Sequence, residues 1–178
     1  MNKIYSAFML VLLLCSNAFG STSSFLIEAV KDRSITPEKV QTLLKSGANV
    51  NAKDKHGYTA LINAAMFATP NIVKLLIDSG ADVHTKNVLG DTALIAAADN
   101  NLNPEVIKIL VAAGADVNAK NKDGTTALMK AAKRKDNAYI VNALLDAGAD
   151  IYAEDNEGRT ALSYADPGMK HIIINAVK

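Results

Sequence analysis

The sequence predicts an all-α repeat fold, a solenoid of stacked helix-turn-helix units with β-hairpin fingers. One observation is a glycine that recurs at spacings of 33, 34 and 34 residues: Gly47, Gly80, Gly114 and Gly148. A threonine recurs in the same register: Thr59, Thr92, Thr126 and Thr160. A fixed period of about 20 to 50 residues indicates that one supersecondary unit is repeated and stacked.

The first helix of each unit is predicted to begin at the triplet Thr-Ala-Leu. The threonine side chain can accept hydrogen bonds from the unpaired backbone N–H groups of the first turn. In the second unit, Leu61, Ala64 and Ala65 follow at i, i+3 and i+4 and define one apolar face. Because alanine is small, neighbouring first helices are expected to approach closely.

A second helix is predicted after a loop, at Thr36-Pro37, Thr69-Pro70 and Asn103-Pro104. The polar residue can cap the helix, and proline suits its first position. The recurring glycine should end this helix in a left-handed C-cap. An extended arm then leads to a finger that turns at a second recurring glycine: Gly57, Gly90, Gly124 or Gly158.

This unit resembles the ankyrin repeat, whose usual motif is T-P-L-H-x-A, so the resemblance implies an ankyrin solenoid. The match recurs in register over almost the whole chain after residue 20. Alanine replaces the motif's proline in all four copies, and its histidine is replaced by Ile62, Ile95, Met129 and Ser163. In the family that histidine joins neighbouring repeats through hydrogen bonds, so apolar contact is the candidate replacement here.

The predicted organisation is a signal peptide at 1–20 and an ankyrin repeat domain at 21–178. Asp166-Pro167-Gly168 should shorten the first helix of the last unit, because proline cannot continue a helix. The domain is divided into an N-cap unit at 22–54, full repeats at 55–87, 88–121 and 122–155, and a C-cap unit at 156–178.

The first twenty residues have the features of a secretory signal. A short basic start at Asn2-Lys3 precedes an apolar run at 4–15, and the small residues Ala18 and Gly20 follow at the spacing of a cleavage site. We expect cleavage after Gly20. The apolar run is shorter than the roughly 20 residues that span a membrane.

Two alternatives to a cleaved signal are an anchor helix that stays attached and a lipoprotein signal that uses Cys15. Leu14 argues against the lipoprotein, because such sites take a small residue before the cysteine. The signal or the lipid would place the protein in the periplasm, on the envelope or outside the cell.

Removal of residues 1–20 would leave a chain that is formally neutral and lacks cysteine. The whole chain has 19 Lys and Arg, 18 Asp and Glu and one cysteine; Lys3 and Cys15 lie in the signal, which leaves 18 bases and 18 acids. Neutrality gives no general attraction to nucleic acid or to an anionic membrane. Stability must come from packing, since disulfides are impossible.

The sequence indicates no catalytic constellation, cofactor or metal, so the protein is not expected to be an enzyme. None of the histidines has a second ligand at a metal-binding spacing: His56, His84 and His171. Three acids share one repeat position and are expected to brace turns: Asp82, Asp116 and Asp150. The basic run at 133–135 is either a solvated helix end or a patch for an acidic partner, and no nucleic-acid partner is expected because interleaved aromatic residues are absent.

The resemblance implies that finger tips and first helices form a concave surface that binds another protein. Val88 and Leu89 are notable because polar pairs stand at the later tips, whereas Met66 and Phe67 could instead pack between first helices. We expect an apolar anchor on the second and third units and a basic flank on the fourth. The candidate protein-binding residues are Tyr58, Met66, Phe67, Val88, Leu89, Lys122, Lys133 and Arg134.

The predicted function is that of a non-enzymatic protein-binding module of the bacterial envelope. The protein is expected to be periplasmic and monomeric, with no membrane span after signal removal and a protein partner that the sequence does not identify. The alternative is a secreted effector or an immunity-type inhibitor that acts on a host protein or a toxin.

Overall fold

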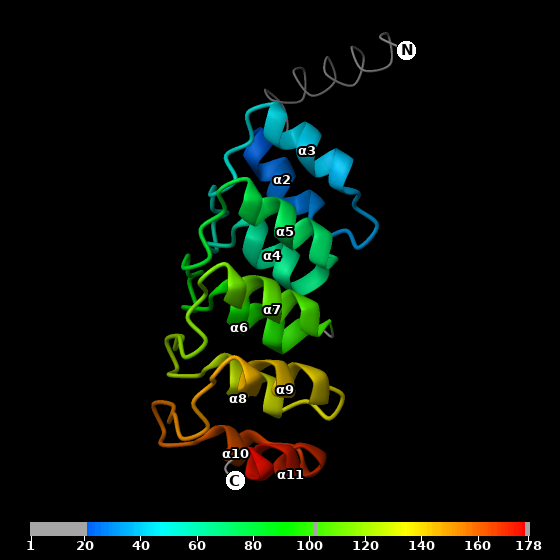
Figure 1. The fold of residues 1–178 in the computed structure, drawn as a ribbon. Coiled ribbons are helices and arrows are strands. Elements are labelled where there is room, and N and C mark those ends of the chain that lie inside the picture. The colour runs from blue at the N-terminus through cyan, green and yellow to red at the C-terminus, as the bar shows by residue number, and fades with distance from the viewer. Residues whose placement is uncertain (1–20, 102, 177–178) are drawn as a thin grey trace.

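The chain forms one continuous stack of helix pairs in the computed structural model, which describes residues 21–101 and 103–176. The pairs follow one another in sequence order from the N-terminal to the C-terminal end (Figure 1). This arrangement confirms the predicted solenoid; the proposed signal and its cleavage site at Gly20 lie outside the described residues. The helices are α2 (Thr22–Ala29), α3 (Pro37–Lys45), α4 (Ala60–Phe67), α5 (Pro70–Asp78), α6 (Ala93–Asn100), α7 (Pro104–Ala112), α8 (Ala127–Ala132), α9 (Ala138–Asp146), α10 (Ala161–Tyr164) and α11 (Pro167–Asn175).

The first helices begin at the predicted threonines. The backbone N–H of Ile62 donates to Thr59 Oγ1 over 3.2 Å, and Thr92 and Thr126 cap α6 and α8 in the same way. Each cap satisfies a backbone donor that has no partner within the helix. The start of these helices is therefore decided locally, by a side chain at the end of the finger.

The first helix was predicted to bury one apolar face, but in the structure it is buried on all faces over its first six residues in α4 and α6. In α4 every residue from 60 to 65 is buried, and in α6 every residue from 93 to 98. A helix that is apolar all round belongs in an interior. The reason lies in the stack, because each inner first helix has a first helix on either side and its own second helix behind it.

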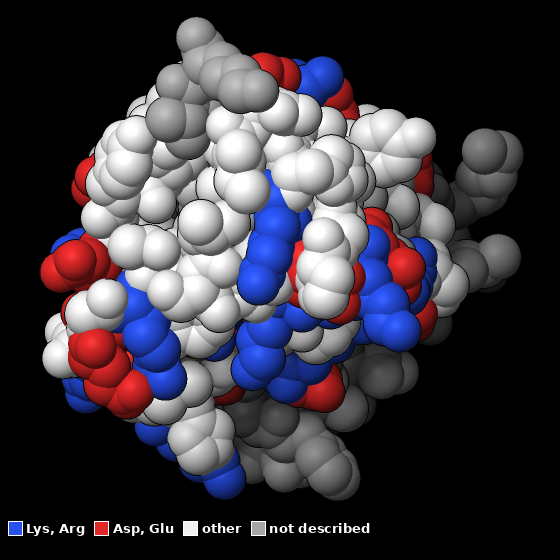
Figure 2. All heavy atoms as spheres, turned by 90° about the horizontal axis from the view of Figure 1, so that it is seen from below, with Lys and Arg blue, Asp and Glu red and all other residues white. Residues whose placement is uncertain are grey.

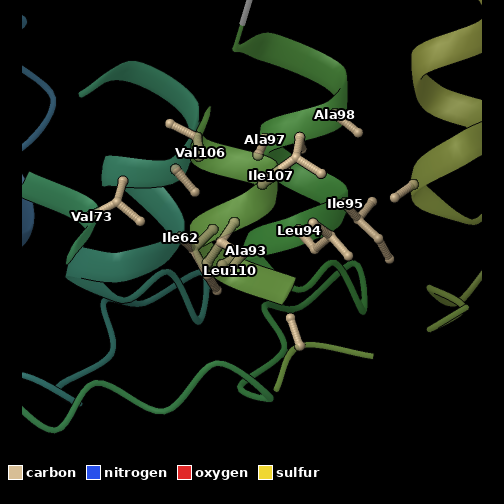
Figure 3. Packing of buried hydrophobic residues seen from close by; sticks show 14 of the residues in the cluster. Ile62, Val73, Ala93, Leu94, Ile95, Ala97, Ala98, Val106, Ile107 and Leu110 are labelled. Carbon is tan, nitrogen blue, oxygen red and sulfur yellow. The ribbon is translucent and has the colours of Figure 1, made fainter. Parts of the chain in front are cut away.

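Large side chains of the second helices complete this core. Val106, Ile107 and Leu110 of α7 are fully buried, as are the small residues Ala97 and Ala98 of α6. Figure 3 shows these residues among the helices of the second and third units. Complete burial of one such branched side chain contributes roughly 1.5–3 kcal/mol. Since the covering atoms come from adjacent units, the stability of each unit depends on its neighbours.

The second helices begin at the predicted prolines, but two of the expected caps are absent. Asn103 Oδ1 accepts from the N–H of Glu105 over 3.0 Å, whereas Thr36 and Thr69 make no capping bond to their helices. Both threonines are exposed, so water can hydrate the N–H groups nearby. The recurring glycines end these helices at positive φ as predicted, +89° at Gly80 for example.

The fingers are tight turns, and none of the residues at 21–101 and 103–176 is in a strand. In the third unit, Asn87 Oδ1 accepts from the N–H groups of Leu89 and Asp91, both over 2.9 Å. The backbone adds one pair of bonds, from Gly90 to Asn87 and from Asn87 to Asp91. The Asn87 side chain thus accepts from backbone N–H groups that would donate to a neighbouring strand in a β-hairpin. Each finger is also too short to form a pair of strands.

Successive fingers are joined by backbone hydrogen bonds of 3.0 Å. Val88 N–H donates to His56 O, Lys122 N–H to Leu89 O, and Asn156 N–H to Asp123 O. The fingers therefore form a ladder that runs across the units. This ladder fixes the backbone of each tip, and in the last finger the Asn156 side chain adds a bond to Lys122 O over 2.8 Å.

Buried asparagines tie the units together at the other end of the first helices. Asn101 Nδ2 donates to Ala65 O over 2.9 Å, and Asn137 Nδ2 donates to Ala98 O over 3.1 Å. Apolar residues occupy three of the four histidine positions of the motif, Ile62, Ile95 and Met129, but hydrogen bonds between units persist through these amides. These bonds could not be predicted from the repeat period, because the two asparagines stand at different positions in their repeats.

The last unit is held by a carboxylate, that of Asp155, which accepts four hydrogen bonds and forms one ion pair. Asp155 accepts from the Tyr164 hydroxyl over 2.6 Å, from Arg159 Nε and from the N–H groups of Glu157 and Arg159 over 2.9 Å each; the Arg159 guanidinium also pairs with it and lies over the Tyr164 ring. The Tyr164 hydroxyl, followed by the N–H and guanidinium of Arg159, holds the pKa of Asp155 well below its usual value. The same bond raises the pKa of Tyr164.

Replacing Gly90 with alanine should destabilise the protein more than replacing Gly114. Both have positive φ, +84° and +90°, which costs a residue with a Cβ about 1–2 kcal/mol. A Cβ at Gly90 would lie 2.7 Å from Lys122 N, whereas no described heavy atom lies within 4 Å at Gly114. Urea unfolding followed by circular dichroism should therefore show a larger loss for Gly90→Ala. Equal losses would contradict the close contact between fingers.

The stabilisation by the Asp155 carboxylate should disappear in acid. Because its folded pKa lies below the ordinary 3.8, the contribution is present above that pH and is lost as pH falls through the folded pKa. The difference in unfolding free energy between wild type and Asp155→Asn should therefore be large near about pH 6 and small near about pH 2. Tyr164→Phe, which removes one donor and keeps the charge, should give a smaller difference. A difference that does not change with pH would refute this role of Asp155.

Candidate functional site

The eight predicted binding residues fall into two groups at opposite ends of the first helices. Tyr58 precedes α4 and Phe67 ends it, and a helix of eight residues is about 12 Å long. The structure therefore does not bring all eight together. The finger group is Tyr58, Val88, Leu89 and Lys122, and the loop group is Met66, Phe67, Lys133 and Arg134.

Val88 and Leu89 form an exposed apolar tip in the finger group. Their exposed fractions are 48% and 55%, although both are large apolar residues. Val88 N–H and Leu89 O are held in the ladder between fingers, so the tip is fixed before any partner arrives. Lys122 is exposed on the next finger, whereas Tyr58 is half-buried and packs against the core.

The loop group borders a hollow of about 490 Å³. Three of its predicted members line this hollow, while Lys133 is exposed at the end of α8 and does not. Met66 also packs against the core, which is the alternative that the sequence left open for it. The lining residues are Arg33, Met66, Phe67, Asn100, Asn101, Asn103, Pro104 and Arg134.

Arg33 is the lining residue that the sequence analysis missed. It lies in the loop of the N-cap unit, whose sequence lacks the repeat motif. Its position could have been predicted from the repeat period, since Arg33, Phe67, Asn100 and Arg134 follow one another at 34, 33 and 34 residues. Residues at the same phase of a solenoid stack on one another, so these four meet on one face.

The basic run at 133–135 divides in the structure. Lys133 and Lys135 are exposed, as expected for a solvated helix end, but Arg134 turns towards the third unit and donates to Asp99 O. The carboxylate of Asp99 faces Lys130 instead, over 3.4 Å. Arg134 is thereby held at the hollow.

The remaining charged residues have structural roles or are dispersed. Asp82, Asp116 and Asp150 each accept a hydrogen bond from the backbone N–H of the residue two positions later. This bond braces the turn as predicted, and it lowers the pKa of Asp82.

At the C-terminal end of the stack, charges of both signs are interspersed with uncharged surface (Figure 2). This end therefore offers no field of a single sign.

The described residues offer neither a metal cluster nor a membrane span. No group of three or more His, Cys, Asp or Glu residues in this part of the chain could hold a metal ion. Of the helices α2 to α11, none is both long and apolar enough to cross a bilayer. What the two groups do present is apolar and cationic surface on a rigid frame, an arrangement suited to binding.

Comparison with known proteins agrees with this reading of the repeats. The family model described as ankyrin repeats (3 copies) matches residues 26–121 and residues 94–172. No curated protein matches the chain. Ankyrin repeats are generally modules for protein–protein interaction. Because the two matches together span residues 26–172, the chain belongs to the ankyrin repeat family.

Proposed function

We propose that the protein is a non-enzymatic module that captures a partner protein through its fingers and the ends of its first helices. The observation that carries this proposal is the tip formed by Val88 and Leu89. Adjoining exposed apolar side chains are typical of interaction sites, and the centre of an interface is its most apolar part.

The tip is particular to the third unit and is not required by the repeat. The equivalent residues are Lys55 and His56 in the second finger and Lys122 and Asp123 in the fourth. A polar pair therefore serves the fold equally well at this position. Burial of a valine or leucine contributes roughly 1.5–3 kcal/mol, and each 1.4 kcal/mol changes Kd about tenfold.

The proposed place of action is the periplasm of a bacterium. Support comes from the features of residues 1–20, with cleavage after Gly20, and from the lack of cysteine in the rest of the chain, which makes folding independent of the redox state. Cell fractionation tests this part: the protein should appear in the periplasmic fraction without residues 1–20. Recovery of the uncleaved chain from the cytoplasm would refute it.

Val88→Asp combined with Leu89→Lys should abolish partner capture without lowering Tm. The substitutions remove the apolar contact, while the exposed side chains make few contacts within the protein. The wild-type and variant proteins, immobilised in equal amounts, would be compared by affinity capture from an envelope extract. The captured partner should fall by about tenfold or more, as expected for a loss above 1.4 kcal/mol.

A matched control introduces the same two residues on the preceding finger, as Lys55→Asp with His56→Lys. Both of these side chains are exposed. The control should retain the partner, and thermal unfolding followed by circular dichroism should show the same Tm for all three proteins. Undiminished capture by the Val88/Leu89 variant would refute the proposed anchor.

A further inference from the structure

The hollow at the ends of the first helices has an arginine at each end and an apolar wall between them. Arg33 comes from the first unit and Arg134 from the fourth, and between them lie Met66, Phe67 and Pro104 of the second and third units. No aspartate or glutamate is among the described residues that line it. We call this feature the arginine hollow.

The guanidinium groups of Arg33 and Arg134 retain N–H donors that no ion pair among the described residues uses. None of the ion pairs found among the described residues includes Arg33 or Arg134. Arg134 uses one of its nitrogens on Asp99 O, and that bond orients the side chain. A guanidinium has five N–H donors and no acceptor, so a carboxylate can still be bound by the rest.

The asparagines of the arginine hollow each make a hydrogen bond within the protein and carry no net charge. Asn101 donates to Ala65 O and accepts from Asn103 N–H, and the side chains of Asn100 and Asn103 bond within their own helices. Recognition of a ligand charge therefore falls to the two arginines. The apolar wall adds a methionine and an aromatic ring, both suited to covering an irregular apolar group.

We infer that the arginine hollow binds an acidic side chain of the partner protein together with an apolar side chain next to it. This inference rests on the proposed function and names the chemistry of its partner. A small inorganic anion would use only an arginine, whereas a peptide with adjacent acidic and apolar residues would contact an arginine and the apolar wall together. Charge complementarity would give the contact specificity and a dependence on salt.

A library of displayed random peptides, selected on the purified protein, tests the inference. The enriched peptides should carry Asp or Glu beside Phe, Tyr, Leu or Ile. Fluorescence anisotropy with a synthetic labelled peptide should then show Kd raised about tenfold or more by Arg33→Ala with Arg134→Ala, because charge-assisted hydrogen bonds are lost. Exchange of the peptide's acid for its amide should weaken binding similarly.

Control variants separate this inference from other effects. Lys39→Ala with Lys45→Ala removes the same net charge from exposed positions on α3 and should leave Kd unchanged. Arg33→Ala alone breaks no side-chain hydrogen bond among the described residues, so it tests the site even if loss of Arg134 impairs folding. The Val88→Asp, Leu89→Lys variant should still bind the peptide, which distinguishes failure of the hollow from failure of the finger anchor.

Three outcomes would overturn the inference. One is selection of peptides without enrichment of acids, and another is an unchanged Kd for a folded Arg33→Ala, Arg134→Ala protein. The third is displacement of the peptide by excess inorganic phosphate at constant ionic strength, which would assign the arginine hollow to a free anion.

Discussion

The first six residues of α4 and of α6 are buried on every side of the helix, and this burial requires the adjacent units. All residues from 60 to 65 in α4 and from 93 to 98 in α6 are inaccessible, and most are alanine, leucine or isoleucine. Alanine permits close approach, and the large residues of the second helices fill the space behind. No unit has a core of its own, so the fold exists only as a stack. Because the units must bury one another, the apolar residues that recur in every repeat lie in the interior.

Polar contacts at both ends of the first helices fix the spacing between units. At one end the ladder between fingers requires close backbone approach at Gly90 and Gly124, where a Cβ would lie 2.7 Å from the next finger. At the other end Asn101 and Asn137 donate to carbonyls of the preceding unit. Burial alone is not directional, whereas these hydrogen bonds are. These contacts hold the finger tips, Asn101 and Asn137 in place, so that binding beside them would cost little conformational entropy.

Features decided within a few residues could be predicted from the sequence. Thr59 and its equivalents cap helices and Gly80 and its equivalents end them, because capping chemistry is local. Features that depend on the stack were not predicted: the burial of residues 60–65 of α4, the hydrogen bonds of Asn101 and Asn137 between units, and the position of Arg33 at the hollow. The finger tip at Val88 could be predicted, since it stands out against the repeat. The separation of the finger and loop groups required the length and direction of the helices in space.

Residues common to all repeats build the buried frame of the molecule, whereas residues that differ between repeats form two proposed binding surfaces, the finger tips and the arginine hollow. Amide hydrogen exchange on the protein with and without its captured partner tests that division directly. Binding should slow exchange in the fingers near 86–91 and in the loop segments near 99–101 and 131–136, while the outer second helices α7 and α9 keep their rates. Slower exchange confined to α5, α7 and α9, with unchanged fingers and loops, would contradict the account.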